Sequence, residues 1–330
     1  DKLIKKQINH LINEIDRSKN LDDKIIGCSA IILAGLAYED KIKFLGYGLK
    51  LLQKIIKFSF DKEGFPKSRN LRQLNFYLKY FILIREWLKE AQSDIPEYLD
   101  EIIYHMGQYY NLIQQNSVIT HLFNGNHITN NSEFENYISR LGYKFKNNDY
   151  EVGGYVFLKN KKFQLAMDVG SSPEKSFSKD YQSGPLSFEF ANNGKKIITN
   201  SGYFQNYKHQ LNLISKSTAC QNTLTLGNYS SAQFLKKPNG ISEINSAIRV
   251  SDKQIIFKDN YWSIRASHDG YLKRFGAIHR REIEYFDDIK KIKGKDKIIR
   301  NKKGKHLNFE IRFHLEPNSK VMKTQDNKNI

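Results

Sequence analysis

Two adjacent polar residues, Arg69 and Asn70, have side chains that suit binding of a carboxylate. The planar guanidinium of an arginine presents a fork of N–H donors that matches the two oxygens of a carboxylate. The amide of Asn70 can donate a further hydrogen bond to the same group. Asparagine is also favoured directly before a helix, and a helical pattern starts at Leu71. The pair is therefore predicted to bind a carboxylate, to cap this helix, or to do both.

A second candidate is the segment His268-Asp269-Gly270-Tyr271. An imidazole whose tautomer is fixed by Asp269 or by a backbone carbonyl is suited to acid–base catalysis. Asp-Gly is also a common signal for a turn between strands, in which Tyr271 would only pack. The segment is thus predicted to be either a catalytic histidine with its orienting group or a polar turn.

The third candidate is an anion-binding surface near residue 280. His279 and Arg280 are neighbours in a segment with strand-like alternation, so their side chains are expected on opposite faces. Arg274, Arg280 and Arg281 together predict an anion-binding surface here. Two other histidines, His121 and His127, lack metal-site spacing and are expected to lie in a loop.

The composition points to an anionic partner. Lys and Arg total 53 against 35 Asp and Glu, a formal net charge of +18, which favours nucleic acid, anionic membrane or acidic polysaccharide. A biased composition, rich in Lys, Ile and Asn, explains the same number equally well. No basic helix with interleaved aromatic residues is present, so nucleic acid is an unlikely partner. No apolar run approaches the ~20 residues of a membrane span.

Neither a metal nor a cofactor is predicted. The two cysteines, Cys28 and Cys220, have no metal-site spacing and form no disulfide framework. Gly153-Gly154 lacks the strand–turn–helix setting of a nucleotide site and is expected to begin a strand. No oligomeric state follows from the sequence.

The first 140 residues have helical periodicity. Helices are expected over most of 1–57, over 71–89, from Pro96 to about Gln115, and from Asn131-Ser132 to Arg140. Gly64 and Pro66 break the pattern between two of them. Antiparallel helices with short loops fit half of an α/α toroid as well as they fit a bundle.

The period changes from 3.6 to 2 at Tyr143, which predicts a domain boundary followed by a β-sandwich or barrel. Leu186, Phe188 and Phe190 alternate with polar residues, and Asn192-Asn193-Gly194 suits a tight hairpin turn. The run 290–305 is expected to be a solvated hairpin. Strands are predicted over 143–147, 153–159, 162–169, 186–191, 195–200, 218–226, 241–250, 253–258, 261–267, 277–286, 296–301 and 306–316.

Several motifs carry a resemblance to a known family. Leu186-Ser-Phe-Glu-Phe190 and Ser217-Thr-Ala followed by Asn222-Thr-Leu-Thr-Leu226 are the clearest, and motifs at 64–70, 122–125, 153–155, 197–202, 266–271 and 275–280 follow in order. Together they resemble the C-terminal part of the heparinase II/III-like family over residues 60–316. Members are polysaccharide lyases and lyase-like proteins with an α-helical toroid followed by an antiparallel β-sandwich.

The resemblance implies an α+β multidomain fold. Residues 1–141 would be a toroid fragment truncated at its N-terminus, and residues 142–330 a β-sandwich truncated at its C-terminus. A bacterial protein that is periplasmic or secreted is implied as well, although this chain contains no signal peptide.

The resemblance also implies a site in the cleft between toroid and sandwich, where an acidic, uronate-containing glycan is cleaved by β-elimination. That reaction needs a group to neutralise the carboxylate, a base and an acid. The predicted catalytic residues are Asn70, His121, Tyr181 and His268. The predicted substrate-binding residues are Ser68, Arg69, Gln73, Asn124, Gln182, Gln221 and Arg280.

Three positions depart from the family pattern. Relatives have a histidine-containing segment just before Leu-Ser-Phe-Glu, where this chain has Asp180 and Gln182, and a histidine before Asn-Thr-Leu-Thr, where it has Gln221. Glutamine is no base near neutral pH and a poor zinc ligand, which argues against the zinc of the family. The chain is therefore predicted to be a lyase or a catalytically weakened homologue that binds anionic glycan without cleaving it.

Overall fold

The computed structural model describes residues 2–18, 20–38, 42–114, 119–128, 132–147, 149–300, 306–317 and 319–322. The chain forms two compact units, which we describe separately. The helical unit comprises Asp1–Lys67, Leu71–Gln115 and Asn130–Asn148, and the sandwich unit comprises Ser68–Asn70, Asn116–Thr129 and Asp149–Ile330. Two short stretches from between the helices thus belong to the sandwich unit.

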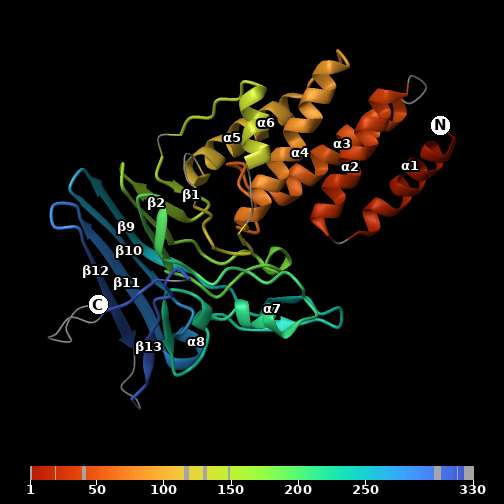
Figure 1. Cartoon of the computed structure of the whole chain (residues 1–330). Helices are drawn as coiled ribbons and strands as arrows, with labels where there is room; N and C mark the ends of the chain where they lie inside the picture. Colours follow the sequence, from red (N-terminus) through yellow and green to blue (C-terminus); the bar gives the residue numbers. More distant parts are fainter. Residues whose placement is uncertain are drawn as a thin grey trace. The chain divides into compact units, whose positions relative to one another are not determined.

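The helical unit contains six α-helices among its described residues (Figure 1). Helix α2 packs against α3 and α4, and α4 packs against α5. Asn20 caps the start of α2, since its side-chain oxygen accepts a hydrogen bond from the backbone N–H of Asp22 at 3.3 Å. The core of the unit includes Ile31, Leu78 and Phe81, all fully buried. The helices are α1 (Lys2–Glu14), α2 (Leu21–Ala37), α3 (Ile42–Ser59), α4 (Leu71–Glu90), α5 (Glu97–Gln114) and α6 (Ser132–Arg140), with a 3₁₀ turn at Ile15–Arg17.

The sandwich unit is built from two antiparallel sheets (Figure 1). The first has the order β1-β2-β3-β4-β5 and the second the order β12-β11-β10-β9. Two-stranded sheets pair β13 with β6 and β7 with β8. The strands are β1 (Glu151–Val152), β2 (Tyr155–Lys159), β3 (Phe163–Asp168), β4 (Phe188–Asn192), β5 (Lys195–Ile198), β6 (Leu224–Leu226), β7 (Phe234–Lys236), β8 (Ser242–Ile244), β9 (Val250–Lys258), β10 (Tyr261–His268), β11 (Ala277–Phe286), β12 (Lys291–Arg300) and β13 (Phe309–Ile311).

One apolar core joins the two sheets. Met167 and Phe188 from the first sheet pack in the same cluster as Trp262, Ile264 and Tyr285 from the second. Strands β2, β3, β4, β10 and β11 place alternate residues in this core, which is the alternation of a two-layer sandwich. The antiparallel β-sandwich expected from the sequence is confirmed.

The central hairpin forms as predicted. Asn193 and Gly194 have φ angles of 48° and 74° between β4 and β5. A two-residue turn with both central residues at positive φ matches the twist of the flanking strands, which is why Asn-Gly is favoured there.

Several predicted elements differ from the structure. Residues 143–147 form no strand and belong to the helical unit. The strand predicted over 218–226 starts only at Leu224, because Thr218–Cys220 form a 3₁₀ turn. The solvated hairpin predicted over 290–305 is instead the long strand β12, which pairs with β11 along its whole length, while residues 301–305 lie outside the described residues. No helix in the described part of the chain is both long and apolar enough to span a bilayer.

Candidate functional site

Arg69 lies in the interior of the sandwich unit, although it precedes helix α4 in the chain. Its Nη2 is 2.6 Å from Asp168 Oδ1, and its Nε donates to Gly153 O at 2.8 Å. The remaining donors go to the carbonyls of Gly154, Gly170 and Ser171 at 3.1–3.2 Å. All five N–H groups of the guanidinium therefore have a protein acceptor, so none is left for a ligand in this arrangement.

The backbone around Arg69 is shaped to hold this side chain. A Cβ at Gly170 would come within 2.3 Å of the guanidinium, so only glycine fits there. The guanidinium also lies over the ring of Tyr155, 4.5 Å from its centroid. Tyr155 in turn donates its hydroxyl hydrogen to Arg69 O at 2.6 Å.

Asp180 is the centre of a group of polar side chains that includes a predicted catalytic residue. Its Oδ2 accepts from Asn70 Nδ2 at 3.2 Å. Its Oδ1 accepts from the hydroxyls of Tyr203 at 3.1 Å and of Tyr207 at 2.9 Å. Asp180 and Asn70 are buried, whereas Tyr207 is half-buried. Two phenol groups thus share one carboxylate oxygen.

Asn124 and Gln182 connect Arg69 to Asp180. Asn124 Nδ2 donates to Asp168 Oδ2 at 3.0 Å, and its Oδ1 accepts from the backbone N–H of Gln182 at 3.2 Å. A Cβ at Gly125 would lie 2.3 Å from the Asn70 amide, so the loop approaches Asn70 closely. The predicted residues Arg69, Asn70, Asn124 and Gln182 therefore meet in one buried hydrogen-bond network.

The two glutamines at positions where histidine was expected have structural partners. Gln182 Nε2 donates to Gly202 O at 2.9 Å and to Ser215 O at 2.7 Å, and Gln221 Nε2 donates to the same Ser215 O at 3.3 Å. Both side chains are buried. Among the described residues, no group of three or more His, Cys, Asp and Glu side chains could hold a metal ion.

His121 belongs to a separate cluster around Glu189. Gln164 Nε2 donates to His121 Nε2 at 3.0 Å, which places the imidazole proton on Nδ1, facing Glu189 Oε2 at 3.1 Å. Burial lowers the pKa of His121. Burial acts to raise the pKa of Glu189, but Lys196 and His121 outweigh it and lower that pKa to about 2. His121 is a neutral donor to a permanently ionised carboxylate at neutral pH.

His268 is the first member of a buried relay across three strands. The backbone N–H of Gly270 donates to its Nδ1 at 3.1 Å, so its Nε2 carries the proton and donates to His279 Nδ1 at 3.1 Å. His279 Nε2 then faces Asp296 Oδ1 at 2.6 Å. Burial, with His279 and Arg281, lowers the pKa of His268 well below its usual value.

The prediction that Asp269 or a carbonyl orients His268 is wrong. Asp269 Oδ1 instead accepts from the backbone N–H of Arg249 at 2.8 Å. A turn N–H and a second histidine fix the tautomer, because they are the hydrogen-bond partners of the two ring nitrogens. The alternative, a polar turn in which Tyr271 packs, fits better, because Tyr271 is buried and donates to Leu224 O at 2.7 Å.

Tyr181 lies in an apolar cluster with Ala232, Ile244 and Ile248. Its hydroxyl has no hydrogen-bond partner within the part of the chain that the structure describes. Burial, with a smaller contribution from Asp168, raises the pKa of Tyr181. A tyrosine base requires the opposite shift.

Comparison with known proteins places this architecture in a family. The family described as "Heparinase II/III-like, C-terminal" matches residues 144–330. The chain belongs to the heparinase II/III-like family. No curated protein matches it.

Solved structures share the fold of this heparinase II/III-like chain. A heparinase III aligns with a TM-score of 0.72 at 16% identity, covering 97% of this chain and 53% of its own. A mutant of the heparan sulfate lyase HepC from Pedobacter heparinus gives 0.72 at 15% identity, with 94% and 50% covered. Another heparinase III gives 0.75 at 15% identity, with 96% and 51% covered. The chain thus spans about half the length of these structures, and identities this low show the fold alone.

The other predicted residues of this heparinase II/III-like protein lie in different settings. Ser68 Oγ accepts from the backbone N–H of Asn70 at 3.2 Å, close to the Asp180 group. Gln73 is buried within α4 of the helical unit. Arg280 lies on the outer face of β11, where it pairs with Asp252 at 2.8 Å. His279 is buried on the opposite face, so the predicted alternation is confirmed.

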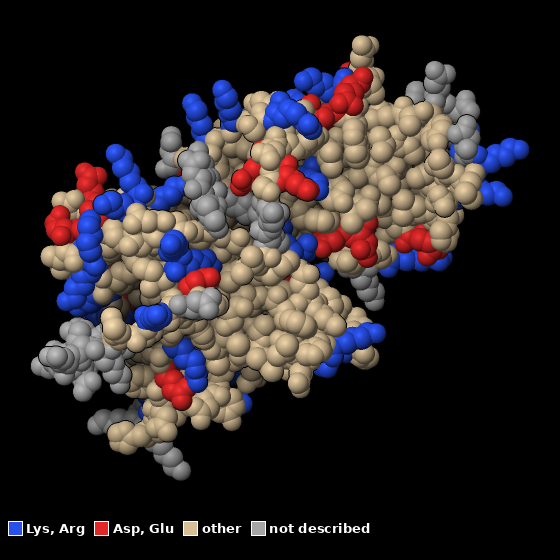
Figure 2. Space-filling view, viewed as in Figure 1, with Lys and Arg blue, Asp and Glu red and all other residues tan. Residues whose placement is uncertain are grey.

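Of the predicted anion-binding arginines, Arg281 does not face solvent. It is fully buried and pairs with Asp296 at 2.7 Å. On the face shown in Figure 2, Lys and Arg side chains are scattered among Asp and Glu side chains. The positive charge of the chain therefore forms no single continuous patch on that face.

Sequence reasoning missed the residues that hold the network together. Asp168 ends a strand without any motif, and Tyr203 and Tyr207 carried no signal beyond residue type. Tyr155 appeared only as the last residue of the family motif at 153–155, with no role assigned. Lys216, also unforeseen, is buried, with its ammonium bonded to the carbonyls of Lys179 and Ser242. The one available signal was the departure at Asp180, which proves to be the acceptor for Tyr203 and Tyr207 as well as for the predicted Asn70.

Proposed function

We propose that this heparinase II/III-like protein takes part in the cleavage of an acidic, uronate-containing polysaccharide by β-elimination. The observation that carries this function is the convergence of Asn70, Tyr203 and Tyr207 on the Asp180 carboxylate. Tyrosine and carboxylate are the acid–base groups that such a reaction uses, and family membership supports the same chemistry. The likeness to heparan sulfate lyases in fold supports a uronate substrate.

In this reaction one proton moves from carbon to oxygen. The proton alpha to the uronate carboxylate is removed, the bond to the leaving glycosidic oxygen breaks, a carbon–carbon double bond forms, and the leaving oxygen is protonated. Tyr207, half-buried at the edge of the group, donates the proton to the leaving oxygen. Asp180, 2.9 Å from the Tyr207 hydroxyl, receives the abstracted proton and returns it to Tyr207.

The other polar groups position this pair. Asn70 and Tyr203 hold the Asp180 carboxylate by hydrogen bonds. The ammonium of Lys179 lies 6.0 Å from the centroid of the Tyr207 ring and supplies positive charge for a uronate. We assign no role in the reaction to His121, Tyr181 or His268, because each belongs to a cluster separate from the Asp180 group.

The test is the absorbance of an unsaturated uronide, with heparan sulfate, alginate and related polymers as substrates. Tyr207→Phe is expected to lower kcat roughly 100-fold or more, since it removes the proton donor and keeps the ring. Tyr229→Phe, at a tyrosine 47% exposed, is the matched control. Product formation at the same rate in both variants would exclude the Tyr207–Asp180 pair as the acid–base group.

A second function, binding of anionic glycan without cleavage, is favoured by the amide contacts of Gln182 and Gln221. Both side chains occupy positions where relatives carry histidine, and both donate to Ser215 O. Binding of heparan sulfate without product, weakened by Arg280→Ala, would support this function. Equal and strongly salt-dependent binding to heparan sulfate and DNA would indicate a general affinity for polyanions instead.

A further inference from the structure

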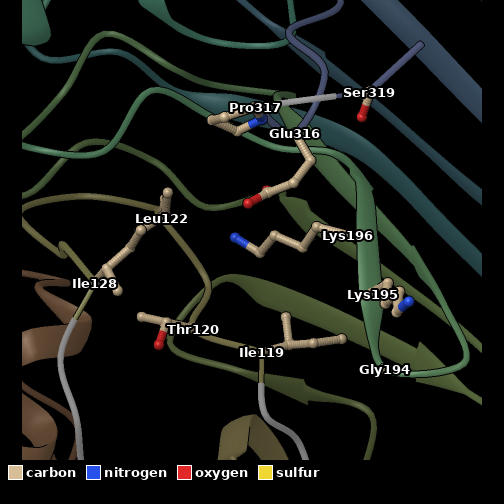
Figure 3. A pocket seen from close by; sticks show the side chains of 10 residues that line it. All are labelled: Ile119, Thr120, Leu122, Ile128, Gly194, Lys195, Lys196, Glu316, Pro317 and Ser319. Atoms are coloured by element: carbon tan, nitrogen blue, oxygen red, sulfur yellow. The ribbon is translucent and has the colours of Figure 1, made fainter.

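A cavity of about 580 Å³ opens on the sandwich unit, and none of its lining residues belongs to the Asp180 group. Three parts of the chain line it: the loop 119–128, the beginning of β5 with Gly194 before it, and the residues Glu316, Pro317 and Ser319 (Figure 3). The size lies within the range of small-ligand sites, about 300–1,000 Å³.

The walls of this cavity are fixed by backbone hydrogen bonds. The N–H of Glu316 donates to Ile197 O at 3.2 Å, and the N–H of Thr199 donates to His314 O at 3.0 Å. The N–H of Leu122 donates to the Glu189 carboxylate at 3.3 Å. The segment after β13 is thereby tied to β5, and the loop is tied to β4.

A positively charged and a negatively charged side chain reach into the cavity. Figure 3 shows the ammonium of Lys196 and the carboxylate of Glu316 both directed towards its centre, with Thr120 at the opposite wall. Lys196 is bonded to Glu189 at 3.0 Å and to Thr199 Oγ1 at 3.1 Å, so its charge is already balanced. Among the described residues, no ion pair involves Glu316, which remains an acceptor with a full negative charge.

Most of the remaining lining is apolar, and its other polar side chains are those of Lys195 and Ser319. Ile119, Leu122, Ile128 and Pro317 form aliphatic walls around the polar groups (Figure 3). A ligand that suits this cavity must offer hydroxyl groups as both donors and acceptors and a C–H surface for the aliphatic walls. An uncharged ligand suits the cavity better than an anion, because Glu316 repels an anion and Lys196 is already paired with Glu189. The ammonium of Lys195, which also lines the cavity, is directed away from that of Lys196 (Figure 3).

We propose that this cavity binds a neutral sugar unit. Glu316 accepts hydrogen bonds from its hydroxyls, Lys196 and Thr120 contact its oxygens, and its C–H face lies against Ile119, Leu122 and Ile128. This site is independent of the reaction at Tyr207 and Asp180, and its ligand differs in charge from the uronate cleaved there.

Methyl NMR of isoleucine-labelled full-length chain tests the site directly, because Ile119 and Ile128 both line the cavity. Titration with methyl glucoside or N-acetylglucosamine is expected to shift these two methyl signals, and glucuronate is expected to bind several-fold more weakly. Glu316→Gln and Thr120→Val should each weaken neutral-sugar binding, roughly tenfold for the loss of the charged acceptor. Glu174→Gln, at an exposed glutamate that does not line the cavity, is the control for the change of charge.

Three outcomes overturn the assignment: no shift of the Ile119 and Ile128 signals with either sugar, shifts that Glu316→Gln and Thr120→Val leave unchanged, or tighter binding of glucuronate. The lyase assay separates this site from the proposed reaction. Tyr207→Phe should abolish product and leave the methyl shifts intact, so either function can fail without the other.

Discussion

At the scale of single residues, the two arginines singled out in the sequence have opposite environments. Arg69 is buried, with all five donors bonded within the protein. Arg280 lies at the surface with one exposed ion pair. The same side-chain chemistry that suits a substrate carboxylate also suits Asp168, and only the fold decides between them.

Replacing Arg69 by alanine should destabilise the sandwich unit by about 3–5 kcal/mol, because Asp168 would remain buried and ionised without its partner. Arg280→Ala should cost less than about 1 kcal/mol, as expected for an exposed pair. The two tryptophans lie in different units. In a Trp87→Phe background, the fluorescence of Trp262 therefore reports the unfolding of the sandwich unit alone as guanidinium chloride is added. Equal midpoints for the two variants would contradict the assigned role of Arg69.

The histidine relay predicts that acid destabilises the sandwich unit. Burial lowers the pKa values of His268 and His279 in the folded state. The unfolded chain therefore takes up protons near pH 6.5 that the folded chain does not, so stability is complete above that pH and falls as the pH decreases. Burial acts to raise the pKa of Asp296, but His279 and Arg281 lower it to about 2, which adds a further loss below about pH 4.

Denaturation at pH 7, 6 and 5 should show this decline. His268→Gln should reduce the slope by up to about 1.4 kcal/mol per pH unit, the contribution of one proton. An unchanged slope in that variant would mean that His268 is protonated in the folded protein.

At the scale of elements, backbone conformation distinguishes turns from strands. Asn193 and Gly194 close the central hairpin at positive φ. Leu186, just before β4, also has a positive φ of 62° although it is fully buried. Its N–H donates to Asp168 O at 2.8 Å and its carbonyl accepts from Arg281 at 3.1 Å, so contacts from other segments hold this unfavourable conformation.

Substitution of glycine by alanine tests the hairpin. Gly194→Ala should destabilise the sandwich unit by about 1–2 kcal/mol, because its φ is 74° and no atom within 4 Å would meet the new Cβ. Gly294→Ala, within β12, should be neutral or stabilising by up to about 1 kcal/mol, since its Cβ would make only an ordinary contact at 3.4 Å with Ile283. Trp262 fluorescence measures both, and equal destabilisation would show that the positive φ of Gly194 is not the cause of its cost.

Local pattern explains which elements were predictable. The helices and the β4–β5 hairpin follow from periodicity and turn residues, which act over a few positions. The first half of β12 was missed because its lysines and Gly294 look solvated, and only pairing with β11 makes it a strand, whereas the strand predicted over 296–301 covers the second half. Part of the site could be predicted, because residue type and the departure from the family pattern drew attention to Asn70 and Asp180. Their contact could not be predicted, because it joins positions 110 residues apart, which no local pattern encodes.

At the scale of the whole molecule, the sandwich unit is not one continuous stretch of chain. Ser68–Asn70 and Asn116–Thr129 belong to it, although helices precede and follow both. Arg69 provides the cation for Asp168, and the loop carrying His121 provides donors for Glu189. A boundary drawn after residue 141, as the sequence suggests, would remove these partners from the sandwich.

Residues 142–330 expressed alone should therefore be markedly less stable than the same region in the full chain. Asp168 and Glu189 would be buried with fewer partners, at a cost of several kcal/mol. The midpoint of Trp262 unfolding in the two proteins measures the difference. An identical midpoint would show that the sandwich needs neither inserted stretch.

This interleaving has a consequence for synthesis on the ribosome. Arg69 leaves the exit tunnel 99 residues before Asp168, and His121 leaves it 68 residues before Glu189. Both side chains are exposed to water until the strands that enclose them have been synthesised. The helices can pack during this interval, but the connections between them lack these partners until β3 and β4 are translated.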